Sequence, residues 1–234
     1  MNPRSFLSIL LCSLACGAPP VAPSTDVPSV KPGINADYLD PALDLERFVQ
    51  RFETESREVY VERNAIVELL GLTPGMRVAD IGAGTGLFTF ELADRVGRAG
   101  QVYAVDLAPR FVEHLRSNVA ERRVANVVVI ACTENDTRLP SNSIDLAFVC
   151  DTYHHFEYPA ATLASIHRAL ARNGQLVVVD FHRIDGVSQA WVFDHVRAGE
   201  AVFTNEIEAA GFVRVPQKAP PGLKDNYVLR FRKR

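Results

Sequence analysis

The chain has 234 residues, of which 47% are apolar and 23% charged, and its formal net charge at pH 7 is −3. This composition is enough for one domain with a sizeable core, and it excludes the global positive field that would attract nucleic acid or an anionic membrane. The sequence contains no C-x-x-C and no Cys/His ligand spacing, so it predicts no metal site.

The first 37 residues differ in character from the rest. One positive charge, a short apolar run and small residues around Cys16 make residues 1–17 resemble a bacterial secretory signal with a lipoprotein box, although Ser13 stands where that box prefers an aliphatic residue. The stretch 18–37 is rich in Pro, Ser and Ala, which is typical of a disordered tether. We expect either an exported protein anchored to the membrane through a lipidated Cys16, or a cytoplasmic protein whose leader comes from a misassigned start codon.

Beyond the tether, helical and strand-like segments alternate over 38–234, which predicts one domain of parallel strands joined by crossover helices. A helical segment at 41–71, in two pieces, comes first. We expect parallel strands at 77–81, 101–107, 127–132, 144–151 and 174–181, with helices at 87–96, 109–122 and 159–171 among them. A helix at 206–210 then precedes strands at 211–215 and 227–232, which must run antiparallel because no helix joins them.

The most informative feature is the run V-A-D-I-G-A-G-T-G at 78–86. It predicts a buried strand that ends in a glycine-rich turn, where the backbone can approach a ligand and a helix N-terminus offers free N–H groups. Asp106 follows Gly86 by 106 − 86 = 20 residues, the spacing at which a carboxylate reaches a ribose diol. Asp80 lies two residues before Gly82. A carboxylate there suits a ligand with an ammonium group better than a nucleotide that carries a pyrophosphate, such as NAD.

This combination resembles motif I and the following acidic position of class I S-adenosylmethionine-dependent methyltransferases. The resemblance covers residue 77 to the C-terminus. It implies a Rossmann-like α/β fold, with a seven-stranded, mostly parallel sheet, helices on both faces and an antiparallel C-terminal hairpin. It also implies S-adenosyl-L-methionine as the cofactor, bound by residues after successive strands: Asp80, Gly82, Ala83, Gly84, Gly86, Asp106, Leu107, Glu134, Asp136 and Asp151. For the adenine amino group, Glu134, Asn135 and Asp136 all remain candidates.

The fourth strand is followed by Tyr153, His154 and His155, at a position that faces the transferable methyl group in the family. The resemblance therefore implies that these three residues form the catalytic group. Either histidine could act as a general base, since imidazole titrates near neutral pH. Alternatively, both shape the acceptor pocket, because a displacement at a sulfonium methyl needs no base when the acceptor is already nucleophilic.

Arg57 lies in the helical segment before the first strand. It could pair with the donor's carboxylate, with Phe52 or Tyr60 as a wall of the site. The alternative is an i,i+4 pair between Glu53 and Arg57 on an amphipathic helix.

No added domain or basic surface points to a macromolecular acceptor, so we expect methyl transfer to a small molecule. The alternative function is a non-catalytic protein that binds S-adenosylmethionine or S-adenosylhomocysteine.

Overall fold

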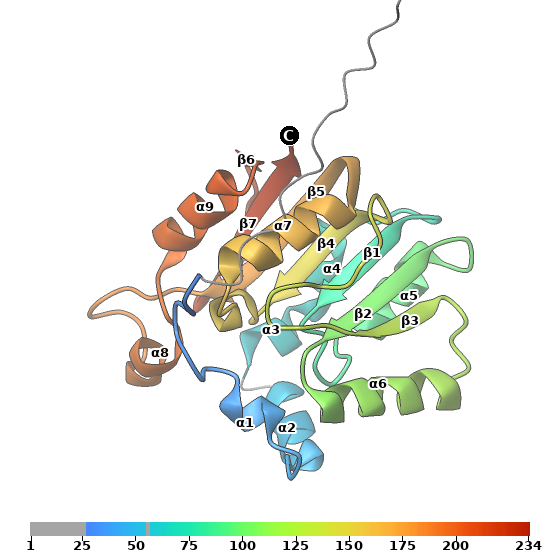
Figure 1. Cartoon of the computed structure of the whole chain (residues 1–234), viewed down its shortest axis with the longest axis horizontal. Helices are drawn as coiled ribbons and strands as arrows, with labels where there is room; N and C mark the ends of the chain where they lie inside the picture. Colours follow the sequence, from blue (N-terminus) through green and yellow to red (C-terminus); the bar gives the residue numbers. More distant parts are fainter. Residues whose placement is uncertain (1–26, 55–56) are drawn as a thin grey trace, which may run out of the picture.

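The computed structural model describes residues 27–54 and 57–234. Seven strands form one sheet in the order β3-β2-β1-β4-β5-β7-β6 (Figure 1). Strands β1 to β5 are parallel, and β7 runs antiparallel to both β5 and β6. The predicted Rossmann-like sheet with its antiparallel C-terminal hairpin is therefore confirmed. The bounds are β1 (Arg77–Ile81), β2 (Gln101–Asp106), β3 (Val127–Ala131), β4 (Ile144–Cys150), β5 (Leu170–Phe181), β6 (Phe212–Val215) and β7 (Asn226–Lys233).

The helices depart from the predicted set in several places. The segment expected as two helical pieces at 41–71 contains three, and α8 was not predicted. The predicted helix at 159–171 ends at Ala169, because Leu170 already pairs with Ile144 as part of β5. The bounds are α1 (Ala36–Leu39), α2 (Leu45–Phe52), α3 (Glu58–Val61), α4 (Arg63–Leu69), α5 (Thr89–Val96), α6 (Pro109–Glu121), the 3-10 turn η1 (Tyr153–His155), α7 (Pro159–Ala169), α8 (Ala190–His195) and α9 (Glu200–Ala209).

Apolar side chains cover both faces of the sheet, as a mostly parallel sheet requires. Alternate residues of β1 enter different cores: Ala79 and Ile81 pack with residues of α7 and α9, whereas Val78 packs with residues of α4 and α5. Since both faces are covered, a ligand can reach the sheet only at the ends of its strands.

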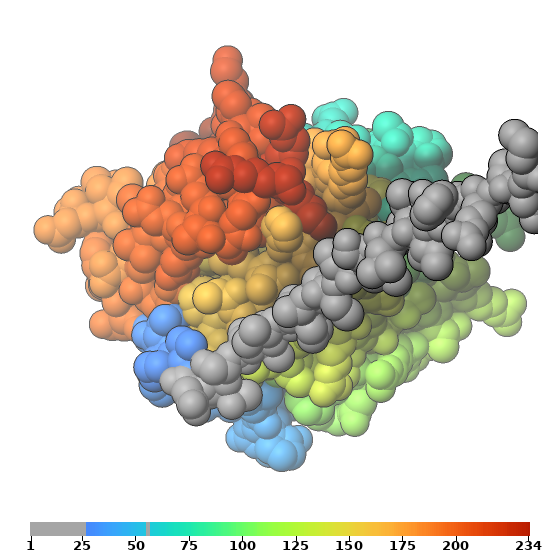
Figure 2. All heavy atoms as spheres, turned by 45° about the horizontal axis from the view of Figure 1, so that its top comes forward, coloured from blue at the N-terminus to red at the C-terminus, as the bar shows by residue number. Residues whose placement is uncertain are grey.

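The N-terminal segment contacts the domain from residue 29 on, before the predicted end of the tether at residue 37. The Ser29 hydroxyl donates to Glu157 Oε2 (2.7 Å), and Lys31 Nζ donates to the carbonyl oxygens of Asp194 (2.7 Å) and His195 (2.8 Å). Figure 2 shows this segment, in blue, against yellow and orange parts of the surface, which belong to the second half of the chain. The prediction of a tether up to residue 37 is therefore wrong for residues 29–37, because polar side chains fix them to the domain.

The predicted leader at 1–17 and the tether at 18–26 lie outside the described residues. Among the helices of residues 27–54 and 57–234, none combines the length and hydrophobicity that a bilayer span requires.

Candidate active site

A cavity of about 700 Å³ lies at the carboxyl ends of the parallel strands, a size within the range of about 300–1,000 Å³ usual for small-molecule sites. Residues that follow β1, β2, β3 and β4 line it, together with side chains of α1, α2 and α8. The lining has two parts. The glycine-loop part comprises residues 82–85 and 106–108, and the histidine part comprises His154, His155, Phe181, Trp191 and His195.

The backbone of the loop after β1 is fixed by its neighbour β2. The N–H groups of Gly82 and Ala83 donate to the carbonyl oxygen of Val105 (2.8 and 3.1 Å). Gly82 has φ +74°, and a Cβ added there would lie 2.2 Å from Thr152 Cγ2. Only glycine therefore allows the loop to pass so close to Thr152 at the end of β4. This contact is the reason for the close backbone approach predicted at Gly82.

Asp106 ends β2 beside this loop and is 6% exposed. Its carboxylate accepts hydrogen bonds from the N–H groups of Gly84 (2.7 Å) and Ala108 (2.8 Å). Burial raises the pKa of this carboxyl to about 6, although the backbone N–H donors act in the opposite direction. A carboxylate oxygen has two lone pairs, so the cavity-lining Asp106 keeps acceptor capacity for a ligand hydroxyl. Leu107 and Ala108 line the cavity next to it.

Asp80 and Gly86, both predicted to bind the cofactor, do not line the cavity. Asp80 is 3% exposed and accepts a hydrogen bond from Thr89 Oγ1 (2.6 Å) at the start of α5. Burial raises the pKa of Asp80 to about 7, and the nearby charge of Asp106 adds to the shift. Gly86 has φ +91°, and a Cβ there would lie 3.1 Å from both Leu115 and Phe90. Asp80 and Gly86 therefore contact residues on the side of the loop away from the cavity and do not face the ligand space.

Of the three candidates after β3, Glu134 alone lines the cavity, beside Cys132 and Thr133. Asp136 instead forms an exposed ion pair with Arg168 of α7 (3.0 Å), and the Asn135 side-chain oxygen accepts from Thr133 Oγ1 (3.0 Å). Asp136 therefore lies outside the predicted cofactor site, because its carboxylate pairs with Arg168 of α7 at the surface.

Asp151 lies in the cavity wall directly after β4, where it pairs with Arg57 and accepts a hydrogen bond from Asn226 Nδ2 (2.6 Å). Burial raises the pKa of Asp151 to about 6, and Arg57 opposes that shift. Arg57 also lines the cavity, and its other terminal nitrogen donates to the Phe52 carbonyl oxygen (3.0 Å). The expected i,i+4 pair with Glu53 does not form, since Glu53 accepts from Thr85 Oγ1 (2.7 Å).

Tyr153, predicted as part of the catalytic group, is fully buried and does not line the cavity. Its ring packs against Phe156 and Phe203, and its hydroxyl donates to Glu206 Oε2 (3.0 Å). The η1 turn points successive side chains in different directions, so that Tyr153 enters the core while its two neighbours reach the cavity.

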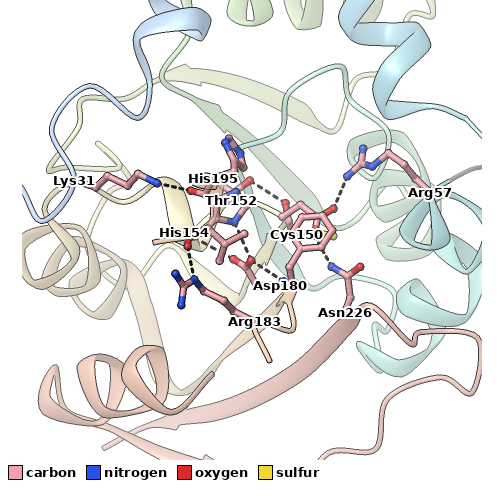
Figure 3. A network of polar contacts seen from close by, with 12 residues as sticks. Lys31, Arg57, Cys150, Thr152, His154, Asp180, Arg183, His195 and Asn226 are labelled. Atoms are coloured by element: carbon pink, nitrogen blue, oxygen red, sulfur yellow. Dashed lines mark hydrogen bonds and ion pairs between the residues drawn. The ribbon is translucent and has the colours of Figure 1, made fainter. Parts of the chain in front are cut away.

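His154 and His155 line the cavity as predicted, and they differ in their surroundings. His154 is 1% exposed, and its Nδ1 lies 2.8 Å from Asp180 Oδ1 at the end of β5 (Figure 3). Desolvation and the nearby His154 and His195 lower the pKa of His155 to about 2. His155 is therefore neutral near pH 7, with a nitrogen lone pair available.

His195, at the end of α8, joins these two side chains, although no sequence pattern predicted it. Desolvation and His154 lower its pKa to about 4. Its ring centroid lies 5.0 Å from that of His154 and 4.9 Å from that of His155. No local motif encodes this contact, because His195 follows His154 by 195 − 154 = 41 positions and His155 by 195 − 155 = 40 positions.

Fold and cavity together define a Rossmann-like α/β domain with its ligand cavity at the carboxyl ends of the parallel strands. Residues 79–178, from β1 into β5, match the family model described as a methyltransferase domain. The chain also superposes on the crystal structure of a SAM-dependent methyltransferase from Aquifex aeolicus with a TM-score of 0.69 and 25% identity, over 81% of this chain and 98% of that one.

Two curated relatives have names that state a particular methyl-transfer reaction or substrate. The chain is 30% identical over 129 residues to the ubiquinone/menaquinone biosynthesis C-methyltransferase UbiE of Ectopseudomonas mendocina, which covers 55% of this chain and 50% of the relative. It is 33% identical over 81 residues to the aklanonic acid methyltransferase DauC of a Streptomyces species, covering 35% and 37%. The chain thus spans about half, or less, of the length of the curated relatives it matches.

Proposed function

We propose that this protein transfers a methyl group from S-adenosylmethionine to a small-molecule acceptor. The observation that carries the proposal is the position of Asp106. Its carboxylate is oriented by the N–H groups of Gly84 and Ala108, and it lines a cavity whose adjoining loop has glycine where a side chain would collide.

The residues present fit this donor. Asp106 suits the ribose hydroxyls, since a buried carboxylate with free lone pairs is a strong acceptor. Glu134 is the remaining candidate for the adenine amino group. Arg57 lines the same cavity and has more N–H donors than its two partners use, so it can also bind the donor's carboxylate. When bound, S-adenosylmethionine supplies an electrophilic methyl group on a positively charged sulfur.

The histidine part of the cavity suits a small organic acceptor. The rings of Phe181 and Trp191 meet edge to face there with centroids 5.0 Å apart, beside the imidazoles of His155 and His195. Apolar walls with a few polar groups orient a ligand and exclude water, which is the main requirement of an in-line methyl displacement. The relatives UbiE and DauC carry names that also indicate small-molecule chemistry.

Calorimetry and turnover test the proposal together. We expect the full chain to bind S-adenosylmethionine and S-adenosylhomocysteine and not NAD, and to release S-adenosylhomocysteine when a panel of phenolic, enolic and quinol acceptors is supplied. Binding of both ligands without turnover on any acceptor would favour the alternative, a non-catalytic binding protein. Absence of binding would contradict both functions.

For location, we propose export and membrane anchoring through a lipidated Cys16, as the leader sequence indicates. The donor is made in the cytosol, so an exported enzyme requires a separate supply of it. Labelled palmitate should enter the wild-type chain, and Cys16→Ser should abolish the label and release the protein from membranes. A chain with Met1 intact in the cytosolic fraction would instead support the cytoplasmic alternative.

A further inference from the structure

Three histidines from two separate segments converge on one point of the cavity wall. His154 and His155 belong to η1 after β4, and His195 ends α8. One side-chain nitrogen of each lies within 4.8 Å of the others. All three line the cavity, so a ligand held between them is in contact with the space where we place the acceptor.

The surroundings of His154 are those of a metal ligand. Asp180, which is 0% exposed, faces its Nδ1 at 2.8 Å, while the other Asp180 oxygen accepts the His154 backbone N–H (3.1 Å). Hydrogen bonding of one imidazole nitrogen to a buried carboxylate fixes the ring and the tautomer, and raises the basicity of the other nitrogen, as in carboxylate–histidine–zinc arrangements.

Two imidazole nitrogens of the cluster have no hydrogen-bond partner among the described residues. His154 Nε2 and His155 Nδ1 are both buried and make no hydrogen bond with the described part of the chain. Leaving a buried polar atom unpaired costs free energy. Two such atoms on adjacent, cavity-lining histidines are nitrogens that a bound metal ion can use as ligands.

The charges and distances near the cluster suit a cation of moderate affinity. Lys31, which donates to the carbonyl oxygen of His195, and Arg51 act against a bound cation, because their positive charge is felt by both His155 and His195. Asp180 acts in its favour. Zinc–nitrogen bonds of about 2.0–2.1 Å in a tetrahedral site place the ligand nitrogens about 3.3 Å apart, so small side-chain rotations are enough to close the site.

We propose that His154, His155 and His195 bind one divalent transition-metal ion of the zinc type, with Asp180 as the carboxylate that positions His154. Three imidazoles suit zinc and its neighbours rather than magnesium or calcium, which prefer oxygen ligands. Three protein ligands also leave a fourth position open to the cavity, as in catalytic zinc sites.

That position selects an acceptor with an ionisable oxygen, such as a phenol or an enol, because a bound cation lowers the pKa of a coordinated hydroxyl. This last step rests on the proposed function, whereas the metal site itself does not.

The test measures metal binding directly. Full-length protein without a histidine tag is stripped with a chelator and titrated with Co²⁺, whose visible absorption reports the coordination geometry, and then with Zn²⁺ in competition with a chromophoric chelator. We expect one equivalent of either ion, with Zn²⁺ displacing Co²⁺. His195→Gln should weaken Zn²⁺ binding at least about 100-fold, and Asp180→Asn about 10- to 100-fold.

His114→Gln is the matched control, because His114 lies on α6, where its Nε2 contacts the Asn118 side chain (2.9 Å) and not the cavity. His195 is partly exposed on a short helix, so its variant should fold even if Asp180→Asn does not. The proposal is overturned if the wild type binds no Zn²⁺ in the micromolar range or if His195→Gln binds it equally well. Donor binding by calorimetry is measured in parallel, so that failure of the proposed function is seen separately.

Discussion

The two parts of the cavity are built in different ways. In the glycine-loop part, backbone N–H groups of residues 82–84 donate to Val105 and Asp106, so that two consecutive βα units supply these hydrogen bonds. In the histidine part, side chains from η1, β5 and α8 meet, and Lys31 fixes the end of α8. Backbone geometry that depends on glycine leaves a contiguous motif in the sequence, whereas a cluster of side chains from distant segments leaves none.

The largest expected effect is on donor binding. Asp106→Ala should weaken S-adenosylmethionine binding by about 2–4 kcal/mol, since it removes charge-assisted hydrogen bonds in a buried site. That loss corresponds to a roughly 30- to 1,000-fold higher Kd by calorimetry. Asp136→Ala should leave Kd unchanged, because its carboxylate pairs with Arg168 outside the cavity. An unchanged Kd in a folded Asp106→Ala protein would contradict the assignment of the donor site.

A second test addresses the backbone origin of the glycine-loop part. Gly82→Ala should lower the free energy of unfolding by about 2–4 kcal/mol, because a Cβ at positive φ is strained and would collide with Thr152. Gly75→Ala is the control: its φ is +92°, but nothing lies within 4 Å of an added Cβ, so it should lose only about 1–2 kcal/mol. Equal losses in urea denaturation would show that the contact with Thr152 does not matter.

The histidine part should affect the acceptor and leave the donor alone. His155→Gln should raise the acceptor KM about tenfold, a change of about 1.4 kcal/mol, while the S-adenosylmethionine Kd stays constant. If His155 is instead a general base, kcat should fall by roughly 10²–10⁴. A parallel loss of donor affinity would mean that the two parts of the cavity are not independent.

Asp80, which supports the glycine loop, and His155 of the histidine part should make contributions to stability that depend on pH with opposite sign. The pKa of Asp80 is raised to about 7 in the folded protein, so its contribution to stability is present below about pH 4, the ordinary range of Asp, and is lost as pH rises toward 7. The pKa of His155 is lowered to about 2, so its contribution is present above about pH 6.5, the ordinary value for His, and is lost as pH falls.

Urea denaturation of variants in a chelator-containing buffer checks these signs. Relative to the wild type, Asp80→Asn should gain stability as pH rises from 4 to 7. His155→Gln should gain relative stability as pH falls from 6.5 to 4. Slopes of the same sign for both variants would disprove the contrast.

The smallest effect is expected from the N-terminal segment. Lys31→Ala removes a cation that donates to the last carbonyl groups of α8 and should lower stability by about 0.5 kcal/mol, seen as a fall in Tm of about 1–2 °C. Lys218→Ala, at an exposed position, should have no effect. If Lys218→Ala lowered Tm as much as Lys31→Ala, the contact of Lys31 with α8 would contribute nothing specific to stability.

Sequence by itself determined the sheet and the glycine-loop part, because each depends on short-range patterns. Strand β1 has the predicted bounds and the other parallel strands lie close to theirs, since each is a short apolar run bounded by polar or turn-forming residues. Gly82, Gly84 and Asp106 also reach the cavity as predicted.

Only the tertiary structure decided which way individual side chains point. Tyr153 enters the core beside His154, Asp136 turns to Arg168, and Asp80 turns to Thr89. Likewise, His195 joins His154 and His155 because α8 packs at the end of β5, a contact between segments far apart in the chain. Residue type and spacing limit which groups are available at a strand end, but the nearest charge, donor or packing gap sets their direction, and those neighbours come from other elements.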